Sequence, residues 1–137
     1  MKYLQIKKDG SIATVSINRQ SSMNALSIEV LKEFCTLQEY FRKDLETRVV
    51  IFTGEGDHFS AGADLKEKPQ LSTKLESWRN NFGKPAIKSI LDIDQITIAA
   101  VNGYCLGGAA CIVSACDFRI ASEEAILGYP EINLGIN

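Results

Sequence analysis

The chain has 137 residues, of which 45% are hydrophobic and 23% charged, and its formal net charge is −2. This length is typical of one domain, and this hydrophobic content is enough for a sizeable core. Lys and Arg are mixed among Asp and Glu, so the sequence offers no basic patch to a nucleic acid or an anionic membrane. There is no apolar signal core at the N-terminus and no run long enough to span a bilayer, so we expect a cytoplasmic protein with no membrane or nucleic-acid partner.

A β-hairpin and a helix are predicted in the first third of the chain. Residues 3–7 and 11–17 alternate apolar and polar side chains on either side of Asp9-Gly10, a dipeptide typical of tight hairpin turns. Ser27 is suited to cap a helix over residues 28–43, where apolar residues recur at helical spacing. We expect this helix to pack on a sheet.

Two more buried strands are predicted on either side of a less regular region. Residues 49–53 and 96–101 are short, β-branched runs, each followed by glycine. Between them, residues 65–75 are polar without a clear period, which predicts a loop over a pocket. Helical character over residues 78–91 is interrupted at Gly83-Lys84-Pro85.

Two glycine-bearing stretches, residues 58–65 and 99–109, each follow an apolar run. A small residue beside glycine leaves a backbone amide uncovered, and two such amides facing one oxygen form an oxyanion hole, in which one donor is worth roughly 3–4 kcal/mol. The second stretch runs into a short apolar helix over residues 109–115, whose first turn adds free N–H groups and the positive end of a dipole. Either stretch alone could be an ordinary tight turn, but the pair predicts a catalytic site.

These two stretches resemble those of the enoyl-CoA hydratase/isomerase (crotonase) family. The resemblance extends in order through residues 24–27, 49–54 and 115–121 to a Pro130-Glu131 turn within residues 127–135. It implies an α/β fold of the crotonase-like (ClpP/crotonase) type, a spiral of ββα units. Subunits of that family are about twice as long, so we expect residues 1–137 to be one core domain that lacks the C-terminal helical part.

The resemblance also implies a substrate and a set of site residues. The substrate is an acyl-CoA thioester, so coenzyme A is part of the substrate and neither a separate cofactor nor a metal is expected. The full-length form is expected to be a homo-oligomer, a trimer or hexamer. The oxyanion donors are the N–H groups of Ala63 and Gly108, the catalytic carboxylate is Glu131, and the substrate-binding residues are Ala61, Gly62, Asp64, Leu65, Gly107 and Cys111.

Cys111 departs from the family pattern. Hydratases of the family carry a second Glu three residues after the glycine that matches Gly108, and two carboxylates orient and split the attacking water. A single base can still move a proton between two carbons, so the cysteine favours isomerase-like chemistry over hydration. A catalytically silent acyl-CoA-binding or scaffold protein is the alternative. A peptidase of related fold would need a serine nucleophile near Gly108, where Ala109 and Ala110 stand.

Other reactive residue types are predicted to be structural. The cysteines form no Cys-x-x-Cys pair, which favours reduced thiols in the core. His58 is interpreted as a polar turn residue rather than a base. Asp117 and Arg119 alternate with apolar residues on a predicted strand, which favours a polar contact with each other or across the sheet.

Overall fold

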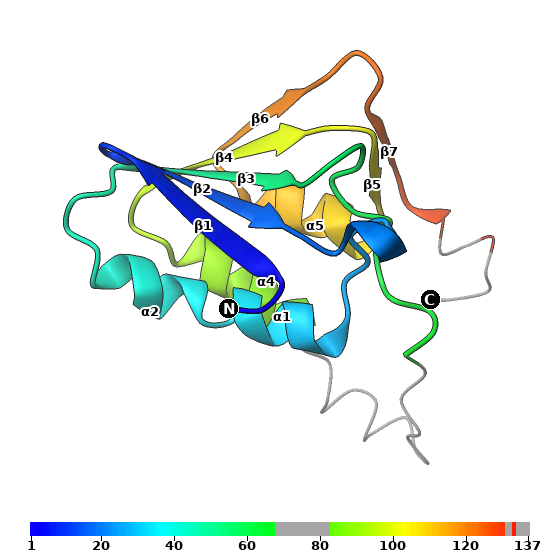
Figure 1. Cartoon of the computed structure of the whole chain (residues 1–137), viewed down its shortest axis with the longest axis horizontal. Coiled ribbons are helices and arrows are strands. Elements are labelled where there is room, and N and C mark those ends of the chain that lie inside the picture. The colour runs from blue at the N-terminus through cyan, green and yellow to red at the C-terminus, as the bar shows by residue number, and fades with distance from the viewer. Residues whose placement is uncertain (68–82, 131–132, 134–137) are drawn as a thin grey trace.

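A five-stranded sheet forms the centre of the computed structural model, which describes residues 1–67, 83–130 and 133. The strand order is β1-β2-β3-β4-β6, with β1 antiparallel to β2 and the other neighbours parallel (Figure 1). The strands are β1 (Leu4–Asp9), β2 (Ile12–Ile17), β3 (Val49–Gly54), β4 (Ile96–Val101) and β6 (Phe118–Ala121). The predicted hairpin and both predicted buried strands are confirmed.

Helices cover one face of this sheet, the lower face in Figure 1. They are α1 (Ile28–Phe34), α2 (Leu37–Arg42), α4 (Gly83–Leu91) and α5 (Gly108–Ala115), and a short 3-10 helix, η1 (Gln20–Ser22), precedes α1. The core lies between the helices and the sheet because alternate strand residues point the same way; it includes Val15, Val50, Phe52, Ala99, Phe34, Phe41, Ile90 and Ile112. Within the described ranges, no helix is both long and apolar enough to cross a membrane.

The predicted helix over residues 28–43 is wrong in its continuity, because α1 and α2 are separate helices. At the break, the hydroxyl and the N–H of Thr36 both donate to the carbonyl oxygen of Glu33, at 2.7 and 3.0 Å. A threonine hydroxyl that bonds to a preceding carbonyl competes with helical hydrogen bonding. The helix therefore ends and restarts at the point where Thr36 offers this local alternative.

The predicted interruption at Gly83-Lys84-Pro85 is also wrong, since all three residues belong to α4. A proline near the start of a helix is tolerated because the first N–H groups have no intrahelical acceptor. The rest of the predicted loop and helix before Gly83, from residue 68 to residue 82, lies outside the described residues.

A second, two-stranded parallel sheet was not predicted. It pairs β5 (Tyr104–Leu106) with β7 (Ile126–Gly128) and stands beyond the ends of β3 and β4 (Figure 1). The chain turns directly from β4 into β5 at Gly103, whose φ is +48°. The turn carries the second glycine-bearing stretch away from the main sheet and directs it towards α5.

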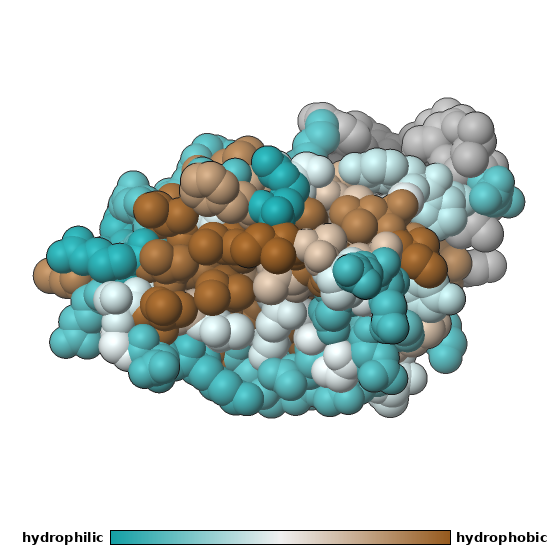
Figure 2. All heavy atoms as spheres, turned by 90° about the horizontal axis from the view of Figure 1, so that it is seen from above, coloured by the Kyte–Doolittle hydropathy of each residue, from teal (hydrophilic) through white to brown (hydrophobic). Residues whose placement is uncertain are grey.

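The outer face of the main sheet is apolar and uncovered by the described helices. The register aligns Ile12, Val49 and Ile96 in one row and Ile51, Ile98 and Phe118 in another. Phe118 and Ile120 on the edge strand β6 are 60% and 67% exposed. Figure 2 shows this face as a broad hydrophobic band.

Candidate functional site

The two glycine-bearing stretches lie side by side because they follow β3 and β4, which are neighbours in the sheet. The N–H groups of Phe59 and Ser60 donate to the carbonyl oxygens of Asn102 and Tyr104 at 2.7 and 2.9 Å, and the N–H of Leu106 donates to that of Ser60 at 3.1 Å. Ser60 and Cys105 thus form a parallel bridge. The stretches meet as the sequence analysis expects.

The approach is close enough to require glycine at position 62. Gly62 has a φ of +88°, a conformation that L side chains rarely adopt, and a Cβ atom there would lie 2.5 Å from the carbonyl oxygen of Leu106. Its N–H is held by the hydroxyl oxygen of Ser60 at 3.1 Å. Gly62, which directly precedes Ala63, is therefore fixed by both its backbone conformation and a hydrogen bond.

A third segment, which precedes α1, pairs with the other side of the first stretch. The N–H of Ala61 donates to the carbonyl oxygen of Met23. Further along, Leu26 bonds to the two residues on either side of Ala63: its N–H donates to the carbonyl oxygen of Gly62 at 2.7 Å, and its carbonyl oxygen accepts the N–H of Asp64 at 3.2 Å. In a parallel ladder this pattern turns the N–H of Ala63 away from the backbone of Leu26. Among the residues that the structure describes, this N–H has no hydrogen-bond acceptor.

The second candidate donor, the N–H of Gly108, is the first of helix α5. Gly107 precedes it as the N-cap with a φ of +55°, and the carbonyl oxygen of Gly107 accepts hydrogen bonds from the N–H groups of Ala110 and Cys111. The first N–H groups of a helix have no intrahelical partner and lie at the positive end of the helix dipole. Within the described part of the chain, the N–H of Gly108 has no acceptor either.

Ala63, Gly108 and Cys111 line one cavity of about 290 Å³. Cys111 reaches it because residues three apart on a helix share a face. Most of the remaining wall is apolar and comes from Leu26, Leu31, Ile87 and Ile112, with Gly83 and Lys84 of α4 at its border. An apolar wall lowers the local dielectric constant and strengthens hydrogen bonds to a developing charge.

Three other predicted site residues take part in the backbone hydrogen bonds around Ala63 and Gly108. Ala61 and Gly62 hold the ladder to the third segment, and the N–H of Gly107 donates to the carbonyl oxygen of Gly128 at 2.8 Å. Leu65 is 55% exposed. Glu131, the predicted catalytic carboxylate, lies outside the described residues.

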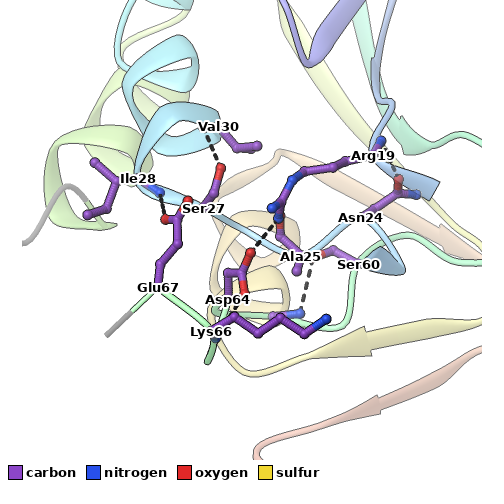
Figure 3. A network of polar contacts seen from close by, with 11 residues as sticks. Arg19, Asn24, Ala25, Ser27, Ile28, Val30, Ser60, Asp64, Lys66 and Glu67 are labelled. Carbon is purple, nitrogen blue, oxygen red and sulfur yellow. Dashed lines mark hydrogen bonds and ion pairs between the residues drawn. The ribbon is translucent and has the colours of Figure 1, made fainter. Parts of the chain in front are cut away.

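Asp64, a predicted substrate-binding residue, does not line the cavity and pairs with a residue that the sequence does not single out. The guanidinium of Arg19 donates through Nη1 to Oδ2 of Asp64 at 2.6 Å and to the carbonyl oxygen of Ala25 at 3.1 Å (Figure 3). This contact, opposed in part by burial, holds the pKa of the Asp64 carboxyl below its usual value. Arg19 is far from Asp64 in the sequence, so no spacing pattern could reveal the pair.

His58, Asp117 and Arg119 each make polar contacts within the fold. The predicted contact of Asp117 across the sheet is observed, whereas the prediction for Arg119 is wrong, since it bonds to the end of α5. Nδ1 of His58 accepts the N–H of Tyr104 at 3.3 Å, and the two rings stack with centroids 4.6 Å apart. Oδ2 of Asp117 accepts both the N–H and the hydroxyl of Thr97 on β4. Arg119 donates to the carbonyl oxygens of Ser114 and Cys116.

All four cysteines are free thiols. Burial raises the pKa of Cys105 to about 11 and that of Cys116 to about 12, so both thiols stay protonated at neutral pH. No cluster of three or more possible metal ligands occurs among the described residues. The candidate chemistry at the cavity rests on the two backbone donors, Ala63 and Gly108.

Known proteins resemble this chain over nearly its whole length. The family model described as Enoyl-CoA hydratase/isomerase matches residues 7–137. The short-chain-enoyl-CoA hydratase of Clostridium acetobutylicum is 39% identical over 132 residues, which are 96% of this chain and 51% of that protein. The peroxisomal Delta(3,5)-Delta(2,4)-dienoyl-CoA isomerase of Arabidopsis thaliana is 31% identical, over 99% of this chain and 53% of that protein.

Solved structures show the same fold. The crystal structure of enoyl-CoA hydratase from Bacillus anthracis superposes with a TM-score of 0.89 at 34% sequence identity, covering 98% of this chain and 53% of that one. The predicted crotonase-like α/β fold is confirmed. The chain spans about half the length of the relatives that it matches.

Proposed function

Because the chain belongs to the enoyl-CoA hydratase/isomerase family, we propose that this protein acts on acyl-CoA thioesters through an enolate that its backbone amides stabilise. The observation that carries the proposal is the meeting of Ala63 and Gly108 at one apolar cavity, each with an N–H that lacks an acceptor among the described residues. A thioester carbonyl oxygen between two such donors gains most stabilisation when it becomes negative. Protons on the adjacent α-carbon then become removable.

Glu131 is proposed as the acid and base that moves the proton. The proposal rests on its match to the catalytic carboxylate of the family in the Pro130-Glu131 turn. A carboxyl group beside an apolar pocket can have its pKa raised towards the working pH, which suits it to both halves of a proton transfer.

Cys111 is proposed to shift the reaction towards isomerisation. It borders the cavity one helical turn from Gly108, where hydratases carry their second carboxylate. A cysteine side chain lacks the carboxylate oxygens that share the task of orienting and deprotonating water, whereas a proton shuttle between two carbons of the substrate needs one base. The relatives include hydratases and an isomerase, so both reactions fall within the range of the family.

The test compares crotonyl-CoA hydration with 3-enoyl-CoA isomerisation, assayed side by side. We expect isomerisation to exceed hydration in the wild type. A Glu131→Gln variant should lose roughly 100-fold or more in kcat, the usual contribution of general acid–base catalysis. A Glu123→Gln variant, which changes an exposed carboxylate eight positions earlier in the sequence, is the matched control and should keep its activity. Efficient wild-type hydration, or full activity without Glu131, would overturn the assignment.

The same assay tests the role of position 111. A Cys111→Glu variant should gain hydration, and a Cys111→Gln variant of the same size should not, because only the first restores a carboxylate beside Gly108. Calorimetry with butyryl-CoA separates the alternative function. Binding without turnover in either assay would favour a silent acyl-CoA-binding protein, and absence of binding would argue against both.

A further inference from the structure

We propose that Arg19 and Asp64 form a positioning device that fixes the direction of the Ala63 N–H in the oxyanion hole. The inference rests on the proposed function, since it concerns how one of the two donors is held. Asp64 directly follows Ala63, but its carboxylate points to Arg19 (Figure 3), and Asp64 is not among the residues that line the cavity. Arg19 and Asp64 are therefore positioning residues rather than catalytic ones.

The ion pair joins the two backbone segments that meet at Ala63. Nη1 of Arg19 bonds to the carbonyl oxygen of Ala25 on one segment and to the carboxylate of Asp64 on the other. These two residues directly flank the bridge between Leu26 and Ala63. The Arg19 guanidinium thus links the two segments on either side of the Leu26–Ala63 bridge. The hydrogen bonds of this bridge determine where the N–H of Ala63 points.

The pair is sheltered enough to keep this geometry. The side chains of Arg19 and Asp64 are 20% and 7% exposed, so water screens their attraction less than that of a surface pair. Charge-assisted hydrogen bonds of this kind are shorter and stronger than neutral ones. A second bond shown in Figure 3, from the N–H of Ile28 to Oε2 of Glu67 at 2.8 Å, ties the segment just after the first stretch to the start of α1.

Arg19 is itself held by a buried asparagine. Asn24 is 1% exposed and has a left-handed backbone with a φ of 54°. Its Oδ1 accepts the N–H of Arg19 at 2.8 Å, and its Nδ2 donates to the carbonyl oxygens of Glu55 and His58. The backbone that carries the Arg19 side chain is therefore anchored, through Asn24, to the start of the first glycine-bearing stretch.

The device supports the weaker part of the ladder. The bond from the N–H of Asp64 to Leu26 is 3.2 Å long, against 2.7 Å for the bond from Leu26 to Gly62. Hydrogen bonds weaken with distance and misalignment, and an oxyanion donor works only when it aims at the position of the developing charge. Without the ion pair, residues 63 and 64 could turn while the remainder of the fold stays in place.

The first experiment measures amide hydrogen exchange by NMR without any ligand, in an Asp64→Asn variant and an Arg19→Gln variant. Loss of the charge-assisted bond should lower the protection of the Leu26 and Asp64 amides by roughly tenfold or more. The matched control is Asp44→Asn, because Asp44 is 8% exposed and forms an ion pair with Lys8 elsewhere in the fold. Unchanged protection in both variants, or an equal loss in the control, would overturn the proposal.

The second experiment measures infrared spectra of butyryl-CoA labelled with carbon-13 at the carbonyl carbon. Binding to the wild type should move the carbonyl band to lower frequency, and the shift should fall by roughly half when one of two donors is misdirected. Asp64→Asn and Arg19→Gln should show the smaller shift, their double variant should show no further loss, and Asp44→Asn should match the wild type. A full shift in the two single variants would overturn the proposal.

The two readouts separate failure of the positioning device from failure of the proposed function. If the bound thioester shows no band shift even in the wild type, the proposed oxyanion hole is wrong. The exchange data then still decide whether the Arg19–Asp64 ion pair stabilises the hydrogen bonds around Ala63. As a control for folding, the circular dichroism spectrum of each variant is compared with that of the wild type.

Discussion

At the scale of single residues, the two glycines beside the candidate donors differ in how much they tolerate a side chain. Gly62→Ala should lower the free energy of unfolding by more than about 2 kcal/mol, because a left-handed L residue alone costs roughly 1–2 kcal/mol and the new Cβ would also meet the Leu106 carbonyl oxygen at 2.5 Å. Gly108→Ala is the matched control. Its Cβ would lie 3.5 Å from Cδ1 of Leu26, an ordinary contact, so a change below about 1 kcal/mol is expected. Urea denaturation measures both, and equal losses would contradict the expectation.

The two glycine-bearing stretches are easier to predict from sequence than the residues that support them. A small residue next to glycine is a local signal that needs no partner, and the resemblance to the family then singles out Ala63 and Gly108 as the proposed donors. The pairing of Arg19 with Asp64 depends on the fold bringing two distant segments together. Nothing in either residue's neighbourhood distinguishes Arg19 from any other surface cation of this chain.

At the scale of elements, the start of α1 is coupled to the site. The hydroxyl oxygen of Ser27 accepts the N–H of Val30 at 3.2 Å, and Ser27 directly follows Leu26, which pairs with Ala63. Ser27→Ala should lower the free energy of unfolding by about 1 kcal/mol, the usual value of an N-cap. Ser114→Ala, at an exposed position inside α5, should change it little. A loss in the Ser114 variant as large as that in the Ser27 variant would show that the cap is not the cause.

The elements that sequence patterns missed are those that depend on a partner. β5 and β7 have three residues each, too few to show an alternating pattern, and they form by pairing with one another. The break between α1 and α2 arises because Thr36 donates to the Glu33 carbonyl oxygen. The helical spacing of apolar residues continues across this break, so the spacing alone does not reveal it. β3 and β4 were predictable because both faces of each strand carry β-branched or small apolar residues.

At the scale of the whole molecule, the outer face of the main sheet predicts self-association of this chain. Phe118 and Ile120 are exposed on an edge strand next to further apolar rows, and exposed apolar patches of this kind mark interaction surfaces. Sedimentation velocity should therefore show a weight that rises with concentration. Phe118→Lys and Ile120→Lys should weaken the association, whereas Leu91→Lys, a change at a 62% exposed residue of α4, should not. A monomer at every concentration would contradict this expectation.

The bridge between Ser60 and Cys105 also determines the order in which the site can be made during synthesis. Residues 58–64 leave the ribosome well before residues 104–106, whose backbone groups fix Ser60 in place. Until β5 has emerged, the first stretch lacks the neighbour that defines its shape, and closing so long a loop is an intrinsically slow, non-local step. A nascent chain can thus complete its β1–β2 hairpin and α1 early, whereas the geometry of the proposed site cannot form before β5 has emerged.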